Sequence, residues 1–305
     1  MEHFQQGSDN NHFKTAYSTA LLRRRMGEQL IRGVRYELNV DSGCQDMPTR
    51  MFLYCPQHAL IYAPIPKVAC SSLKTWIYDC MREDMPLLPD LSGLAKREFH
   101  LFLYWTFCLG RYYNWESRNI LSNPKITKFT FVRNPFDRIA SAYLDKFVRK
   151  RGNENQWEHT RPVLQKLFGR QDVDVSSHSM SFRQFVQYLV EAQDNELDLH
   201  WQPMKFFIEP FKMDFVGRIE NIAEDFARLK EITGMQGSLK HINKSHGQRA
   251  GTTDGVFTDH TPDELLSLDA LPEARQLYDE QTEKGIAVRY ARDFELFEYS
   301  KKIVR

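Results

Sequence analysis

An apolar run, a loop of small residues and an amphipathic helix pattern follow one another between residues 59 and 81. The run at 59–65 is typical of a buried strand. Apolar side chains then recur at helical spacing, at Leu73, Trp76, Ile77, Cys80 and Met81. A strand–loop–helix unit of this kind directs backbone N–H groups and the positive end of a helix dipole at one point. The segment therefore predicts an α/β unit with a site for an anion.

The loop between this strand and helix carries the groups that would hold the anion. Its residues are Pro66, Lys67, Val68, Ala69, Cys70, Ser71 and Ser72. Lys67 supplies a positive charge, and the two serines supply hydroxyl donors, one of which we expect to cap the helix. Cys70 is interpreted as a small, buried residue. A strand–loop–helix turn with a merely solvated lysine would show the same pattern, so this segment alone leaves both interpretations open.

A second strand–turn–helix unit follows at residues 125–147. Its strand pattern ends at Val132, so Arg133 is expected at the C-terminal edge of the sheet, where ligands of open α/β sheets bind. Pro135 suits the first turn of the next helix, and Ser141 lies two turns further on. The alternative for Arg133 is an ion pair with Asp137. Two separate anion loops predict a ligand with two separated phosphates.

The rest of the chain alternates helix patterns with short strand patterns. We expect helices at 14–33, from 101, at 181–193, at 220–234 and through much of 262–290, and strands within 50–63 and at 214–217. Irregular backbone is expected at 84–100, in a polar excursion at 149–178, and in a long loop at 236–260. This order favours an α/β fold with a mainly parallel sheet. Residues 1–50 form an N-terminal extension in this interpretation.

Composition narrows the class of protein. The chain has 305 residues, 42% hydrophobic and 27% charged, with a net charge of +1, which argues against a nucleic-acid binder. Its five cysteines include no CxxC pair and no metal-ligand spacing, so neither a disulfide framework nor a metal site is expected. No apolar run is long enough to cross a membrane, and the first residues are polar. These features predict a soluble, cytoplasmic protein.

Together these segments resemble the PAPS-dependent carbohydrate sulfotransferases (sulfotransferase family 2), which include the chondroitin and dermatan enzymes. Residues 66–74 resemble the 5′-phosphosulfate loop of that family, and residues 132–147 resemble its 3′-phosphate segment. Weaker similarities occur at 198–203, 214–220 and 290–297. The resemblance implies a P-loop-like three-layer fold, with a mainly parallel central sheet flanked by helices, in a single sulfotransferase domain over 51–300.

The resemblance also implies roles for the two loops. PAPS would be the sulfuryl donor and adenosine 3′,5′-bisphosphate (PAP) the product, with no metal required. Lys67 would act at the bridging oxygen, the loop with its two serines would bind the 5′-phosphate, and Arg133 with Ser141 would bind the 3′-phosphate. A basic loop would close over the nucleotide through Lys244, Ser245 and Arg249, although a solvated charged loop explains these residues equally well.

A general base is needed to take the proton of the acceptor, and histidine suits that task near neutral pH. Among ten histidines, His100 lies between the two phosphate loops, where related heparan enzymes carry a catalytic histidine. His200 lies in the 198–203 segment. Both are candidates.

The absence of an evident anchor or of paired cysteines departs from the Golgi members of the family. It favours a soluble, bacterial-type member that acts on an oligosaccharide or small-molecule hydroxyl or amine, with no nucleic-acid partner and no stable membrane insertion. A basic groove for a polyanionic glycan would use Lys146, Arg149, Lys150 and Arg151, which otherwise form a solvated helix end. The alternative functions are a P-loop-type kinase or NTPase and a catalytically inactive PAPS-binding module.

Overall fold

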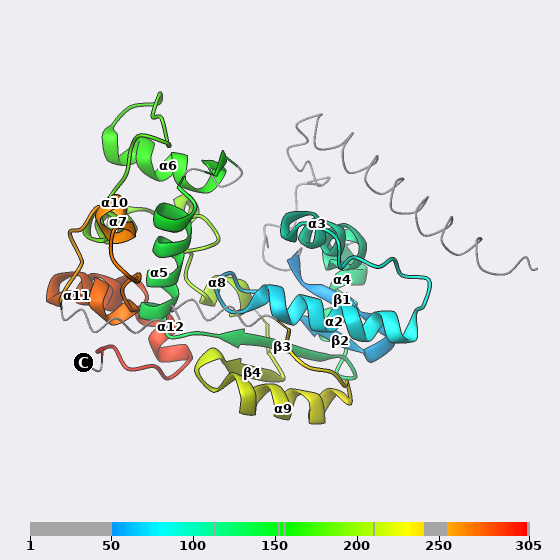
Figure 1. Ribbon diagram of the computed structural model, residues 1–305. Helices are drawn as coiled ribbons and strands as arrows, with labels where there is room; N and C mark the ends of the chain where they lie inside the picture. Colours follow the sequence, from blue (N-terminus) through cyan, green and yellow to red (C-terminus); the bar gives the residue numbers. More distant parts are fainter. Residues whose placement is uncertain are drawn as a thin grey trace, which may run out of the picture.

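The computed structural model describes residues 51–112, 114–151, 153–154, 157–209, 211–240 and 255–303. A four-stranded sheet in the order β1-β2-β3-β4 lies at the centre (Figure 1). β1 (Leu53–Cys55) pairs antiparallel with β2 (Leu60–Tyr62). β2 pairs parallel with β3 (Thr127–Val132), and β3 pairs parallel with β4 (Phe215–Arg218). The mainly parallel sheet predicted from the sequence is confirmed.

Helices pack against the sheet (Figure 1). They are α2 (Cys70–Asp84), α3 (Lys96–Phe107), α4 (Asn114–Ser122) and α9 (Ile222–Thr233). The apolar faces of these helices and strands form one core, in which the Trp76 ring lies edge-on to Phe129 and Phe226. The sheet flanked by helices that the sequence predicts is confirmed.

A second group of helices lies beyond the C-terminal end of β3 (Figure 1). α5 (Pro135–Tyr143) leaves that strand and continues as the π-helical segment η4 (Leu144–Arg149). Around it lie α6 (Trp157–Phe168), α7 (Phe182–Glu191), α10 (Pro262–Leu266), α11 (Glu280–Arg289) and α12 (Ala291–Leu296). These helices enclose a separate core, so α5 and η4 join the sheet to a helical subregion.

Short elements complete the described chain. They are the 3-10 helices η2 (Pro56–His58), η3 (Leu109–Arg111), η6 (Asp194–Glu196), η7 (Ile219–Asn221) and η8 (Ala274–Leu277) and the helix α8 (Lys205–Ile208). None of the described helices is both long and apolar enough to span a bilayer.

Two predictions about local structure are wrong. The excursion at 149–178 contains α6, because Thr160, Val163 and Leu164 give it a buried face despite its many charged residues. α3 begins at Lys96 rather than near 101, because the Glu98 carboxylate accepts the Ala95 N–H and so caps the helix.

Helix is present through much of 262–290, as expected, and it is divided into α10, η8 and α11. Pro272 stands between the first two, and the Asp279 side chain accepts from the Thr282 N–H to start α11 anew. The expected helix at 14–33 and the whole 1–50 extension lie outside the described residues, as do Lys244, Ser245 and Arg249.

Candidate active site

The parallel strands bring three loops to one edge of the sheet. β2, β3 and β4 run in the same direction, so the segment after Tyr62, the turn at Arg133 and η7 all leave at their C-terminal ends. The Thr130 hydroxyl donates to the Ala63 carbonyl at 2.7 Å and so holds the first of these loops against β3. This edge is where ligands of open α/β sheets bind.

The loop after β2 reaches α2 through left-handed backbone. Lys67 has φ 67° and Ala69 has φ 47°, and neither is glycine. Left-handed backbone costs an L-residue roughly 1–2 kcal/mol, and such strain is concentrated at functional sites. α2 begins at Cys70, with Ala69 as an N-cap that forms no side-chain hydrogen bond. The first N–H groups of α2, which have no intrahelical acceptor, therefore lie at the end of this loop.

The expectation that a serine caps α2 is wrong. Ser71 and Ser72 lie inside its first turn, because the left-handed backbone at Ala69 starts the helix one residue before Ser71. Ser72 is buried. Cys70 is only partly buried, so the interpretation of Cys70 as a buried residue is wrong. Pro66 and Val68 are buried and fix the loop to the core.

Lys67 is held by an acidic residue that the sequence analysis did not single out. Its Nζ lies 2.9 Å from Asp145 Oδ2, and Lys150 Nζ lies 2.8 Å from Asp145 Oδ1. Burial lowers the pKa of Lys67 to about 8, although Asp145 opposes that shift. Burial raises the pKa of Asp145, but the two lysines outweigh it and hold that pKa well below its usual range. Asp145 is thus an anion already paired with Lys67.

Arg133 and Arg138 come from the second unit and have different surroundings. Arg133 Nη1 donates to the Lys67 carbonyl at 3.4 Å, which brings the two anion loops into contact. Burial lowers the pKa of Arg133, while Asp137 and Glu220 raise it, so the alternative of an Asp137 partner has electrostatic support. Ser141 is buried on α5, within the same unit.

Arg138 is a buried clamp. Its guanidinium is 1% exposed and donates to the carbonyls of Pro66 at 3.1 Å, Gln202 at 2.8 Å and Leu199 at 3.3 Å. One side chain therefore fixes the Lys67 loop beside the 199–202 segment, which carries His200.

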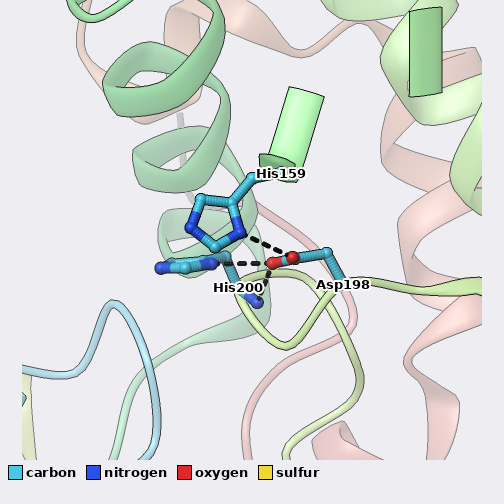
Figure 2. A group of neighbouring side chains, drawn as sticks. All are labelled: His159, Asp198 and His200. Atoms are coloured by element: carbon cyan, nitrogen blue, oxygen red, sulfur yellow. Dashed lines mark hydrogen bonds and ion pairs between the residues drawn. The ribbon is translucent and has the colours of Figure 1, made fainter. Parts of the chain in front are cut away.

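His200 belongs to a cluster of three polar side chains (Figure 2). Its Nδ1 lies 2.7 Å from Asp198 Oδ1, and His159 Nδ1 lies 2.7 Å from Asp198 Oδ2. Burial lowers the pKa of His200 to about 4 against the raising effect of Asp198, so its imidazole is neutral at physiological pH. Burial lowers the pKa of Lys146 to about 8, and the carboxylates of Asp145 and Asp198 oppose that shift.

Lys146 links the cluster to the Lys67 loop. It follows Asp145 in the π-helical η4, a kind of helix segment often found at functional sites. Its charge acts on both Lys67 and Asp198, and its side chain is 4% exposed. A solvated helix end is therefore wrong for Lys146. Lys150 pairs with Asp145 and Arg151 with Asp263, so neither is simply solvated.

His100 faces a different space. It lies on α3 and lines a cavity of about 570 Å³ together with Ser71, Ser72 and Tyr78. Burial, reinforced by Lys74 and Lys96, lowers the pKa of His100 to about 3. Its Nε2 is buried and has no hydrogen-bond partner among the described residues. Both candidate histidines are therefore neutral at physiological pH.

Comparisons with known proteins agree with this geometry. The model of the sulfotransferase family matches residues 50–300. The chain belongs to the sulfotransferase family. It is 27% identical to carbohydrate sulfotransferase 11 of Mus musculus and 28% identical to carbohydrate sulfotransferase 8 of the same species, over 80% of this chain in each case. It is 31% identical to carbohydrate sulfotransferase 12 of Xenopus laevis over 57% of this chain.

The matched region of this sulfotransferase covers 65%, 55% and 46% of those three relatives, so the chain spans only part of their length. No solved structure matches it. The resemblance stated from residues 66–74 and 132–147 is thus confirmed at the level of the family and of the α/β fold.

Proposed function

We propose that this sulfotransferase moves a sulfuryl group from PAPS to a hydroxyl group of a carbohydrate or of a related small molecule. The contact between the two anion loops, from Arg133 Nη1 to the Lys67 carbonyl, carries the proposal. A nucleotide with phosphates at its 3′ and 5′ positions needs two cationic sites that are close but separate. The three relatives are all carbohydrate sulfotransferases, which supports a carbohydrate acceptor.

The residues fit such a donor. Lys67 and the first N–H groups of α2 would bind the 5′-phosphosulfate, because a cation and a helix N-terminus both favour anions. Arg133, whose guanidinium can bind two phosphate oxygens at once, would bind the 3′-phosphate with Ser141. Asp145 would then neutralise the charge of Lys67 whenever no donor is bound.

In the reaction, the acceptor oxygen bonds to sulfur, and the bond between sulfur and the bridging oxygen breaks. The electron pair of that broken bond stays on the 5′-phosphate oxygen, where Lys67 stabilises the charge. We assign the base to His200, whose Nε2 takes the acceptor proton while Asp198 holds its Nδ1–H. Arg138 keeps the His200 segment beside the Lys67 loop.

A thermal-shift experiment tests donor binding. PAP is expected to raise the melting temperature more than adenosine 5′-monophosphate does, because only PAP fills the second anion site. Arg133→Gln should abolish the difference between the two nucleotides. Stabilisation by ATP with Mg²⁺, and none by PAP, would support the kinase alternative and overturn the proposal.

Turnover separates an enzyme from an inactive PAPS-binding module and decides between the histidines. Labelled sulfate from PAPS would be followed onto a panel of mono- and oligosaccharides. His200→Ala should reduce kcat by roughly 10²-fold or more, the usual contribution of a general base, with PAP affinity unchanged. If His100→Ala loses turnover and His200→Ala keeps it, His100 is the base. If the wild type transfers no sulfuryl group, the protein is an inactive PAPS-binding module.

A further inference from the structure

Both oxygens of the Asp198 carboxylate are engaged by histidines. Oδ1 accepts the His200 backbone N–H at 2.9 Å and lies 2.7 Å from His200 Nδ1, while Oδ2 lies 2.7 Å from His159 Nδ1. The three side chains are between 17% and 21% exposed. Figure 2 shows both rings meeting the one carboxylate from different elements.

The positions of the protons follow from this arrangement. Burial raises the pKa of Asp198, but the hydrogen bonds from the two histidines outweigh it, so the carboxylate is ionised and can only accept. Each Nδ1 therefore carries a proton, and the lone pair of the neutral His200 ring is on Nε2. That atom is the one a general base needs.

The same geometry weighs against a shared metal ion. The ligand atoms of the three side chains lie within 4.8 Å of one another, close enough for one ion. A metal ion requires bare nitrogen lone pairs, whereas both Nδ1 atoms are at hydrogen-bond distance from carboxylate oxygens. The buried Lys146 ammonium, whose charge acts on Asp198 and His200, would also repel a cation.

His159 reaches the cluster from α6, which contacts both α7 and η4. Thr160, Val163 and Leu164 are buried and hold this helix in place. The far side of the His159 ring faces Glu158, with Nε2 3.5 Å from Oε1. His159 thus binds Asp198 with one ring nitrogen and faces the Glu158 carboxylate with the other.

We propose that His159 is a positioning residue for the His200 base. By occupying Asp198 Oδ2, it fixes the carboxylate rotamer and leaves Oδ1 as the acceptor for His200 Nδ1–H. Without His159, the second oxygen is open to the neighbouring Lys146, and the carboxylate can turn toward that ammonium. His200 then loses its partner and relaxes to the tautomer with the proton on Nε2, which cannot act as a base. This inference rests on the proposed role of His200.

Nitrogen NMR of the ¹⁵N-histidine-labelled protein tests the inference without any substrate. In the wild type, His200 is expected to carry its proton on Nδ1, the minor tautomer of free imidazole. His159→Ala should shift His200 toward the Nε2–H form. His159→Asn should restore the wild-type tautomer, because its amide N–H replaces the Nδ1–H donor to Asp198. His260→Asn, a change on a different segment of the chain, is the matched control.

Activity gives the second readout. His159→Ala should lower kcat about tenfold with KM for PAPS unchanged, and His159→Asn should recover most of that loss. An unchanged His200 tautomer and normal kcat in a folded His159→Ala protein would overturn the inference. So would stoichiometric Co²⁺ binding that His159→Ala abolishes, because the cluster would then be a metal site. If the wild type transfers no sulfuryl group, the proposed function fails, and the NMR result still decides what His159 does to His200.

Discussion

The two strand–turn–helix units at the edge of the sheet follow one plan and differ in how their helices begin. In the second unit, the Asn134 side chain accepts from the Phe136 N–H at 2.9 Å, and Pro135 occupies the first helical turn. In the first unit, Ala69 is the N-cap, has left-handed backbone and offers no side-chain acceptor. The N-terminus of α5 is capped by the protein's own side chain and so has a structural role. The N-terminus of α2 has no side-chain cap, so its N–H groups are available to a ligand.

The charged side chains of the two units show the same division between structure and ligand binding. Arg138 of the second unit donates to three backbone carbonyls of the protein, so its guanidinium is used for structure and not for binding a ligand. Lys67 of the first unit is held by Asp145, which the anionic donor of the proposed function would replace. A comparison of substitutions in the two units therefore separates binding and catalysis from stability.

The largest effect is expected at Lys67. Lys67→Ala should lower kcat/KM for PAPS by roughly 10³-fold, because the charge that develops on the leaving oxygen is no longer stabilised. Radiolabelled sulfate transfer to the best acceptor of the panel measures it. Lys150→Ala removes the other lysine that binds Asp145 and is the matched control, with a loss of less than about threefold expected. Equal losses in both variants would show that Lys67 matters only as a partner of Asp145.

The next largest effect is on stability and belongs to the second unit. Arg138→Gln should lower the free energy of unfolding by about 3 kcal/mol, because a buried guanidinium is lost and carbonyls are left without a donor. Arg133→Gln, in the turn that precedes α5, should cost less than about 1 kcal/mol of stability while weakening PAP binding. Urea denaturation and PAP titration of both variants measure the two effects. A destabilised Arg133→Gln with normal PAP affinity would reverse the comparison.

Much of this edge could be predicted from the sequence, because local patterns determine it. The strand pattern before Arg133 and the helix pattern after Pro135 are periodic and strong, and the structure confirms both elements. The role of Arg138 could not be predicted, since its three acceptors lie 61 to 72 residues away along the chain. Only the fold brings those carbonyls together.

The polar partners of the site were missed for the same reason. Asp145 is 78 residues from Lys67 in sequence, and it falls in a helix whose charged residues look solvated. His159 lies in a segment expected to be irregular, 39 residues from Asp198. Pairing of a lysine or histidine with a distant carboxylate leaves no periodic signal in the sequence. The pairing of His200 with Asp198 is different, because this aspartate lies only two residues before the histidine and could have been recognised from the sequence.

The pH dependence of kcat/KM sharpens the contrast between base and cation. As the proposed base, His200 must be neutral, so the rate should rise with pH through its pKa of about 4. As the proposed cation at the leaving oxygen, Lys67 must be charged, so the rate should fall about tenfold per pH unit above its pKa of about 8. In Asp145→Asn, the falling limb should move to lower pH, because Asp145 raises the pKa of Lys67. A falling limb that stays fixed in this variant would assign it to another group.

A smaller effect is expected at the helix caps. Asn134→Ala should lower the free energy of unfolding by about 1 kcal/mol, because it removes the acceptor for the Phe136 N–H. Ser71→Ala should change stability by less than about 0.5 kcal/mol, since Ser71 is inside α2 and does not cap it, but it should weaken PAP binding. Chemical denaturation and PAP titration check both. If Ser71→Ala lowers the free energy of unfolding as much as Asn134→Ala does, Ser71 caps α2 as the sequence predicted.

The smallest effect has the opposite sign. Ala69→Gly should raise the free energy of unfolding by roughly 0.5–1 kcal/mol, because glycine adopts the left-handed backbone at φ 47° without steric cost. Ala140→Gly, in the middle of the capped helix α5, is the matched control and should lower it by about 1 kcal/mol. If both glycines destabilise equally, the first loop stores no strain. If Ala69→Gly stabilises the protein but weakens PAP binding, the strained backbone is what holds the N–H groups of α2 ready for the donor.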